Sequence, residues 1–491
     1  MADEFEVMIT ADEAWPVLER AVLNAQHHIT AGFRIFDMST RLRSDEARAV
    51  GKDWFDLLAD AVRRGVRVDL TVSDFDPVMR TGLHEICWRT VRQGVALSEV
   101  TSAGPDRLQV RAHLHPAQAG ALPWIAFLPA VLRKRWDSLR QTTPVQRRVQ
   151  AVGLERNLLP RLHTVSHHQK VAAIDDDWLY IGGLDLNERR YDTPAHARPA
   201  RHTWSDVQVM VRGPEARAAR RHLETLREVT SGRQPPPDCP GLKRTLSAPR
   251  RVQLPYLSPR TLVSEIEDAH LYAFRTARHL IHIETQFIRS SRIAEGLAEA
   301  AQKNSALTAV MVLPGLPEDV AFDSSDSIDA RFGLGLRQRA IATLRDGFGQ
   351  RLTIATPVRP VLAARDTDET LAGSPLIHVH NKVLIRDDDY AMIGSANLNG
   401  RSMHWDTELA LEVTATARVT KARDRLLSHW WHAPLPPEAT APETLQPWWD
   451  TEIRRNGVSL PENRKGFLVP FDPERGADLA QPLPGVTEDI V

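Results

Sequence analysis

Two short segments of the chain carry residue types at a spacing that could do chemistry, and the second repeats the first. Each runs from a His-x-Lys pair through an aspartate, five positions after the lysine, to a pair of small residues that begins seven positions later. The residues are His168, Lys170, Asp175, Gly182 and Gly183 in the first segment and His380, Lys382, Asp387, Gly394 and Ser395 in the second. This matched duplicate, with one copy in each half of the chain, predicts a catalytic site built from two half-sites.

The apolar runs before and after each aspartate indicate a hairpin of two strands. Residues two apart in a strand share a face, so the histidine and lysine of each pair should point the same way, and His167 should face away from His168. Two converging ammonium groups could stabilise the oxygens of a phosphodiester while phosphorus is attacked. One imidazole could attack phosphorus and the other could protonate the leaving oxygen. The small residues Gly183 and Ser395 would let the backbone approach the phosphate. This chemistry requires no metal and no other cofactor.

These segments resemble the signature of the phospholipase D superfamily, HxKxxxxD followed by GG or GS. The second copy reads HNKVLIRD and then IGSANLNGRS, and the first reads HHQKVAAIDDDWLYIGGLDLNERRYDT, which is similar to the GGLDL-type phospholipase D enzymes. Ile283 to Phe287 (IETQF) also resembles a segment that those enzymes carry between their motifs. The resemblance covers roughly residues 10–432. One departure is Asp185, which stands where many members have an asparagine that the second copy keeps as Asn397.

The resemblance implies a role for each matching residue. His168 would be the nucleophile that becomes phosphohistidine, and His380 the acid for the leaving group. Acidic residues after each motif, Asp206 and Glu408, would orient the histidine of the opposite half by fixing its tautomer and stabilising imidazolium. The phosphate would be held by Lys170, Lys382, Asn397, Gly183 and Ser395. Asp175 and Asp387 complete the catalytic motifs and are expected to support the fold and the lysines.

The two halves also match outside the motifs, because strands alternate with helices of apolar period in the same order in each. This alternation predicts an α/β fold with two tandem α/β/α sandwich repeats and the active site between them. The expected domains are an N-terminal repeat at residues 1–232, a linker at 233–250, a C-terminal repeat at 251–432, and a Pro-rich strap and tail at 433–491. We expect the tail to lie along the surface or to be partly mobile.

An insertion at residues 105–150 precedes the first motif and contains ALPWIAFLPAVLRKRW, an apolar and aromatic run that ends in a basic cluster. Two interpretations are open. A helix of this composition could lie in the interface of a bilayer with anionic headgroups. The favoured interpretation is a packed core helix with a basic cap, because Pro123 and Pro129 interrupt the apolar period.

Composition limits the remaining possibilities. A chain of 491 residues is longer than the range in which a single core keeps growing, so two domains are expected. The net charge of −1 gives no overall attraction to nucleic acid, and the two cysteines, Cys87 and Cys239, make no disulfide framework. We find no apolar segment typical of a signal peptide or a transmembrane helix. The sequence therefore predicts a protein that is cytoplasmic or peripheral to a membrane, and we expect a monomer.

The function that these observations favour is that of a phospholipase D, which hydrolyses a glycerophospholipid to phosphatidic acid and the head-group alcohol. Transfer to another alcohol is expected wherever one competes with water. The alternative is a cardiolipin-synthase-like phosphatidyltransferase. A nuclease of the same superfamily is less favoured, since its phosphate backbone would require a basic track, and two complete motifs disfavour a non-catalytic lipid-binding protein. The expected partner is a phospholipid at a membrane surface, with no nucleic acid.

Overall fold

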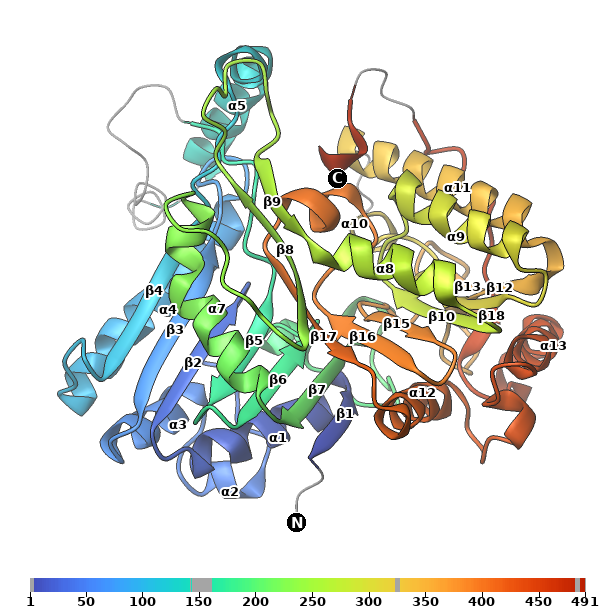
Figure 1. Ribbon diagram of the computed structural model, residues 1–491, viewed down its shortest axis with the longest axis horizontal. Helices are drawn as coiled ribbons and strands as arrows, with labels where there is room; N and C mark the ends of the chain where they lie inside the picture. Colours follow the sequence, from blue (N-terminus) through green and yellow to red (C-terminus); the bar gives the residue numbers. More distant parts are fainter. Residues whose placement is uncertain (1–3, 142, 144–160, 323–326, 482–485, 491) are drawn as a thin grey trace.

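Two β-sheets lie side by side in this computed structural model, with helices around both (Figure 1). The structure describes residues 4–141, 143, 161–322, 327–481 and 486–490. The N-terminal half of the chain forms a seven-stranded sheet and the C-terminal half a nine-stranded sheet. The expected α/β class with tandem repeats is confirmed.

The two sheets share a run of six strands in the same order. In the first sheet the order is β1-β7-β6-β5-β2-β3-β4, and in the second it is β18-β12-β11-β10-β15-β16-β17-β8-β9. The strands of the first sheet are β1 (Phe5–Ile9), β2 (His28–Phe33), β3 (Arg67–Asp74), β4 (Leu108–Leu114), β5 (Lys170–Ile174), β6 (Trp178–Gly182) and β7 (Val207–Arg212). Those of the second are β8 (Leu242–Ala248), β9 (Arg260–Ser264), β10 (Leu280–Thr285), β11 (Thr308–Val312), β12 (Leu352–Pro357), β15 (Lys382–Arg386), β16 (Tyr390–Gly394), β17 (Glu408–Val413) and β18 (Leu468–Pro470). The run β7-β6-β5-β2-β3-β4 is thus repeated as β17-β16-β15-β10-β11-β12.

Helices cover both faces of each sheet. The helices are α1 (Thr10–Asn24), α2 (Asp45–Arg48), α3 (Trp54–Arg63), α4 (Thr81–Thr101), α5 (Ala121–Gln141), α7 (Glu215–Thr230), α8 (Glu265–Thr276), α9 (Ser291–Lys303), α10 (Glu318–Ala321), α11 (Ile328–Phe348), α12 (Thr416–Trp430) and α13 (Leu445–Val458). Helices α1, α3 and α4 pack on one face of the first sheet, and α8, α9 and α11 pack on the corresponding face of the second. A short β13–β14 hairpin (Thr370–Leu371 and Ser374–Pro375) stands apart from both sheets.

The two halves meet through the motif hairpins themselves. Val171 and Ala173 of β5 share an apolar core with Val383 and Ile385 of β15, while the alternate residues of each strand face the helices of their own half. This alternation is the period of two that a strand imposes on its side chains. Burying an aliphatic side chain of this size contributes about 1.5–3 kcal/mol. The central core therefore holds the starts of β5 and β15, where the motif lysines lie, close together.

Two segments differ from the sequence prediction. Residues 242–248, expected within the linker, form β8 and pair with β17. The tail was expected along the surface, but α13 buries Trp449 and Ile453 against the second sheet and β18 pairs with β12. The two tryptophans at the start of α13 and the short strand after it supply too few apolar residues for a periodic pattern to be recognised in the sequence.

The insertion forms β4 and the helix α5, which stands out at one end of the molecule (Figure 1). Pro129 lies inside α5 and does not end it, and large apolar side chains on the helix are exposed, including Ile125 and Trp136. The favoured interpretation of a packed core helix was therefore wrong. Within the described part of the chain, no helix has both the length and the apolar character needed to cross a membrane.

Candidate active site

Each His-x-Lys segment lies alongside the acid-bearing segment of the other half. His167 forms a parallel bridge with Thr407, and Val379 forms one with Ser205. The backbone N–H of His168 donates to the carbonyl of Thr407 at 2.8 Å, and that of His380 donates to the carbonyl of Ser205 at 2.8 Å. Because the paired segments run in the same direction, the next residues along them also come together. The histidine of each half therefore meets the carboxylate of the other.

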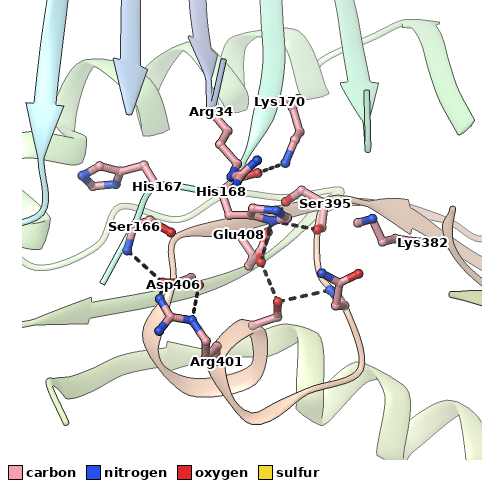
Figure 2. Close-up of polar contacts among 12 residues, drawn as sticks. Arg34, Ser166, His167, His168, Lys170, Lys382, Ser395, Arg401, Asp406 and Glu408 are labelled. Atoms are coloured by element: carbon pink, nitrogen blue, oxygen red, sulfur yellow. Dashed lines mark hydrogen bonds and ion pairs between the residues drawn. The ribbon is translucent and has the colours of Figure 1, made fainter. Parts of the chain in front are cut away.

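The two histidine–carboxylate pairs are formed. Nδ1 of His168 lies 3.0 Å and 3.1 Å from the two carboxylate oxygens of Glu408, and 3.1 Å from the carbonyl oxygen of Ser395 (Figure 2). Nδ1 of His380 lies 2.6 Å from Oδ2 of Asp206. All four residues are buried or nearly so. With Nδ1 of each ring on its carboxylate, Nε2 of each ring remains for chemistry, which is the arrangement expected from the sequence.

The two lysines flank these pairs. The ammonium group of Lys170 donates to the carbonyl of His168, and that of Lys382 donates to the carbonyl of His380. Both lysines are buried, and burial lowers the pKa of each, to about 7 for Lys382. Their positive charges add to burial in holding the pKa of His168 and of His380 well below the usual value. All four motif side chains are therefore close enough to act on one another, and the site is suited to an anionic group.

The orienting carboxylates have unusual acidity. Burial raises the pKa of Asp206 to about 7, and it raises that of Glu408 to about 7. Hydroxyl groups oppose this effect on Glu408, since Ser402 donates to Oε1 at 2.7 Å and Ser395 donates to Oε2. Each pair can thus gain or lose a proton near neutral pH, which is the range that acid–base catalysis requires.

Asp175 and Asp387, the acidic residues of the motifs, lie away from this chemistry. Asp175 accepts the backbone N–H groups of residues 26–28 at 2.7–2.9 Å, and Asp387 accepts those of residues 278–280 at 2.8–2.9 Å. Each carboxylate thus holds the start of a neighbouring strand, at the far end of β5 or β15 from the lysine. The expected support of the fold is seen, but the expected support of the lysines is not, because the full length of a strand separates them.

The small residues after each motif also have contacts that differ from the expectation. The N–H of Gly183 donates to Val207 and that of Ser395 donates to Leu409, so neither N–H is available to a phosphate. A Cβ atom on Gly183 would lie 2.1 Å from Oδ1 of Asp206. Gly183 is therefore required because the orienting carboxylate occupies the space of a side chain. Both positions serve the histidine–carboxylate pairs instead of the phosphate.

Asn397 and Asp185 occupy equivalent positions in the two halves. The residues after them form equivalent bridges, Leu186 with Phe36 and Leu398 with Ile288. The carbonyl oxygen of the Asn397 side chain is buried without a hydrogen bond in the described structure, which leaves its amide to be oriented by a ligand. Asp185 instead accepts from the N–H of Ile35 at 3.0 Å.

Sequence reasoning missed Arg34, which lies beside His168 and Lys170 (Figure 2). Its Nη1 is 3.6 Å from Oδ2 of the buried Asp185. Burial acts to raise the pKa of Asp185, but the cations Lys170 and Arg34 outweigh it and hold that pKa below its usual value. In the two equivalent bridges, Phe36 of the first half corresponds to Ile288 of the second. Arg34, two positions before Phe36, therefore corresponds to Gln286 of the IETQF segment. That equivalence is the signal in the sequence that could have identified Arg34.

Sequence reasoning also missed other side chains that contact the motif residues. The ring of Trp204 packs against that of His380, with centroids 4.6 Å apart and planes tilted by 37°, and the Arg190 guanidinium lies 3.6 Å over the same indole. The middle residues of the two motifs point to the back of the strands, where Gln169 bonds His222 at 2.7 Å and Asn381 donates to Glu284. Figure 2 shows His167 directed away from His168, as expected, and its Nδ1 lies 2.8 Å from the hydroxyl of Thr407.

The described residues include no group of three or more histidine, cysteine, aspartate or glutamate side chains placed to hold a metal ion. Metal-independent turnover stays a prediction.

Comparison with known proteins gives consistent matches. Residues 271–431 match the family described as "Cardiolipin synthase, PLD-like domain". The chain is 24% identical to Phospholipase D1 of Schizosaccharomyces pombe over 351 residues, and 27% identical to Phospholipase D2 of Bos taurus over 261 residues. These matches cover 53% and 44% of this chain and 26% and 28% of the relatives, so the chain spans about a quarter of the length of those proteins.

The solved structure of phosphatidylserine synthase from Haemophilus influenzae Rd KW20 has a similar fold. It superposes with a TM-score of 0.50 at 13% identity, over 93% of this chain and 94% of that one. At this identity the likeness concerns the fold alone. From the paired motifs and the sequence matches, we conclude that the chain belongs to the phospholipase D superfamily.

Proposed function

We propose that the protein is a phospholipase D, which cleaves the phosphodiester of a glycerophospholipid on the head-group side. The observation that carries this proposal is the crossed arrangement of the two histidine–carboxylate pairs around two buried lysines. Such a site offers a nucleophile, an acid and two cations to one phosphodiester. These are the groups that a double displacement at phosphorus requires.

The first step forms a phosphoenzyme. With Glu408 ionised, Nδ1 of His168 carries the proton and donates it to the carboxylate, so Nε2 presents its lone pair to phosphorus. A bond forms between Nε2 and phosphorus, and the bond from phosphorus to the head-group oxygen breaks. His380 delivers a proton from Nε2 to that leaving oxygen, while Lys170 and Lys382 stabilise the charge on the non-bridging oxygens.

The second step regenerates the enzyme. Water gives a proton to Nε2 of His380 and attacks phosphorus, and the bond between phosphorus and His168 breaks to release phosphatidic acid. A primary alcohol that takes the place of water gives a phosphatidyl alcohol by the same proton transfers. The balance between the two products depends on which acceptor reaches the phosphoenzyme.

The second candidate is a phosphatidyltransferase that uses a lipid hydroxyl as the acceptor. It is favoured by the description of the family that matches residues 271–431, which names cardiolipin synthase. The chemistry of the first step is the same, so the two candidates differ only in the acceptor.

Product analysis distinguishes these candidates. Purified protein is incubated with mixed phosphatidylcholine, phosphatidylethanolamine and phosphatidylglycerol, with and without butan-1-ol. Phosphatidic acid that is partly replaced by phosphatidylbutanol is the result expected for a phospholipase D. Cardiolipin formed from phosphatidylglycerol would identify the transferase. Absence of any phospholipid product, together with cleavage of DNA, would contradict both proposals.

A parallel assay tests whether turnover requires a metal ion. We expect hydrolysis of a soluble short-chain phosphatidylcholine to continue in EDTA. Complete loss that only a divalent ion restores would contradict the mechanism above.

A further inference from the structure

The helix α5 has two apolar faces, and only one of them packs against the protein. Val131 is buried, and Trp124 and Leu128 on the same side are half-buried. On the other side Leu122, Ile125, Leu132 and Trp136 are 42–59% exposed. These four residues follow the three- and four-residue spacing of one helix face, which Pro129 completes at the surface. The exposed stripe is therefore a continuous face and not a scatter of single residues.

A second segment extends this apolar face. The N–H of Leu122 donates to the carbonyl of Leu254 at 3.0 Å, and that of Gly120 donates to the carbonyl of Tyr256 at 2.8 Å. These bonds hold the loop between β8 and β9 against the start of α5, as Figure 1 shows. Val252 and Leu254 of this loop are 69% and 57% exposed. Contiguous exposed apolar surface built from two separate segments is characteristic of an interaction site.

Basic residues flank the stripe, apart from Arg135, which is half-buried on the packed side of α5. Residues 121–141 and 249–258 together carry six arginine or lysine residues and one carboxylate, a net charge of +5 against −1 for the whole chain. Arg133 and Arg140 lie on the same side of the helix as the stripe, and the Arg140 guanidinium lies 5.0 Å over the ring of Trp136. A tryptophan paired with a cation beside aliphatic side chains suits the boundary between acyl chains and headgroups.

The base of α5 is connected to the active site. Gln118, at the base of α5, forms a β-bridge with His163. His163 is five residues before the proposed nucleophile His168, so at most about 17 Å of chain separates His163 from His168. Val165 within this stretch packs with Ala117, Leu257 and Trp405, and Trp405 precedes the segment that ends in Glu408. This distance is comparable with the ~15 Å depth of hydrocarbon in one leaflet. A surface at this position could hold the active site near the headgroups of a bilayer.

We propose that the exposed stripe of α5 and the 252–254 loop form a docking surface for bilayers rich in anionic phospholipid. Its apolar side chains would enter the acyl boundary, and the surrounding arginine and lysine residues would contact anionic headgroups. The proposal rests on the proposed function, since a phospholipase must bring its site to lipid packed in a membrane. A second copy of the chain is a poorer occupant, because a symmetric contact would place the two basic sets against each other.

Vesicle binding tests the docking surface without requiring catalysis. The protein carries His168→Ala, so that the vesicles stay intact, and its binding to phosphatidylglycerol–phosphatidylcholine (1:1) vesicles is measured by sedimentation. Ile125→Glu with Trp136→Glu should weaken binding by about tenfold or more. Arg133→Gln with Arg140→Gln should weaken it by about fivefold per charge for anionic vesicles, and much less for pure phosphatidylcholine.

Val458→Glu is the matched control, since Val458 is 89% exposed at the end of α13, away from α5 in Figure 1. It should leave vesicle binding unchanged, and all variants should keep the melting temperature of the parent protein. Binding that the stripe variants do not weaken, or wild-type protein that does not bind these vesicles, would overturn the proposal. A dimer in solution that Ile125→Glu dissociates would also overturn it, because a second copy would then cover the stripe.

A soluble substrate separates this proposal from the proposed function. In enzyme with His168 intact, Ile125→Glu with Trp136→Glu should hydrolyse monomeric short-chain phosphatidylcholine at the wild-type rate and lose about tenfold or more on vesicles. Vesicle binding that depends on the stripe in a protein inactive on both substrates would reject the phospholipase and keep the docking surface. Full activity on the short-chain substrate, with equal vesicle activity in the stripe variant and the wild type, would keep the phospholipase and reject the docking surface.

Discussion

The two half-sites share a histidine, a lysine and a crossed carboxylate, but the groups that hold each carboxylate differ. Glu408 accepts the hydroxyls of Ser395 and Ser402, whereas Asp206 accepts the indole N–H of Trp204 at 3.3 Å and the backbone N–H of Val207 at 3.0 Å. Donors of both kinds favour the ionised carboxylate, and burial raises the pKa of each carboxyl to about 7. An ionised Glu408 keeps the His168 proton on Nδ1 and leaves Nε2 free to attack. These hydrogen bonds therefore do not by themselves distinguish the two half-sites, and the assignment of His168 as the nucleophile stays a prediction.

A second difference lies beside the lysines. The first half pairs Arg34 with Asp185, where the second half has the neutral residues Gln286 and Asn397 at the equivalent positions. The departure from the asparagine of the family signature is therefore matched by a change at its neighbour, and the local charge stays balanced. A duplicated site can thus keep its reacting groups while the surroundings of each copy diverge.

The largest effect should come from removing a histidine, and the leaving group should reveal which one is the nucleophile. His168→Ala should lower turnover by about 10⁴-fold or more with any substrate, because no nucleophile remains. His380→Ala should cost about 10²–10⁴-fold with a phospholipid but far less with a 4-nitrophenyl phosphodiester, whose leaving group needs little protonation. Steady-state kinetics with both substrates makes the comparison.

Peptide mapping of the acid-labile phosphoenzyme should place the label on His168. A label on His380, with the leaving-group effects exchanged, would reverse the two roles. His167→Ala is the control. It removes the contacts of His167 with Thr407 and with the stacked ring of His113, so it should lower the melting temperature more than it lowers turnover per folded molecule.

Neutralising the orienting acids should have the next largest effect. Glu408→Gln and Asp206→Asn should each lower kcat by about 10²–10⁴-fold, since an amide can no longer fix the tautomer and stabilise imidazolium. KM should change little, because the lysines that would bind the phosphate remain. With the 4-nitrophenyl substrate the Asp206→Asn defect should shrink and the Glu408→Gln defect should persist. Equal defects with both substrates would mean that the half-sites are not specialised.

The Arg34–Asp185 pair should show a smaller effect that depends on its partner. Arg34→Gln leaves the buried Asp185 with one cation fewer, so it should lower the free energy of unfolding by about 1–3 kcal/mol. The loss should be smaller than that from breaking a fully buried ion pair, because the Arg34 side chain is 21% exposed. Adding Asp185→Asn makes the first half resemble the second and should restore most of the loss. Urea unfolding and kcat of both single variants and the double variant provide the cycle. Additive losses would show that the two residues act independently.

The parts that could be predicted from sequence are those encoded by local spacing. The apolar runs before and after each motif aspartate predicted both hairpins, which β5 and β6 form in the first half and β15 and β16 form in the second. The crossed acids came from the family resemblance, since no local pattern states that residues 206 and 380 meet. Their contact depends on how the two sheets pack.

Other features could not be predicted because they depend on neighbours distant in the chain. Arg34 contacts Asp185 only because the segments that follow β2 and β6 meet, at the bridge between Phe36 and Leu186. Gly183 was read as a space for phosphate, but that space holds the Asp206 carboxylate from the neighbouring chain segment. The outer face of α5 was misjudged because Pro123 and Pro129 were taken to interrupt its apolar period, whereas the helix continues through Pro129 and leaves Ile125 and Trp136 exposed.

The smallest predicted effect is a shift in pH dependence caused by one hydroxyl. The two pairs must differ by one proton, since Glu408 must be ionised for His168 to attack while the His380–Asp206 pair must hold an extra proton to donate. Burial raises the pKa of each carboxyl to about 7. The kcat/KM profile should therefore be bell-shaped, rising with pH as Glu408 ionises and falling as the other pair loses its proton.

Ser402→Ala removes a donor to the Glu408 carboxylate and should raise the pKa of that group further. The acidic limb should then move to higher pH by up to about one unit, while the basic limb stays in place. Ser205→Ala is the matched control, because the Ser205 hydroxyl donates to Asn381 at 3.1 Å and not to a carboxylate. It should leave the acidic limb unchanged. Profiles measured on the soluble short-chain substrate separate these limbs from any change in vesicle binding. Movement of the basic limb in Ser402→Ala would assign the acid to His168 and contradict the division of roles between the half-sites.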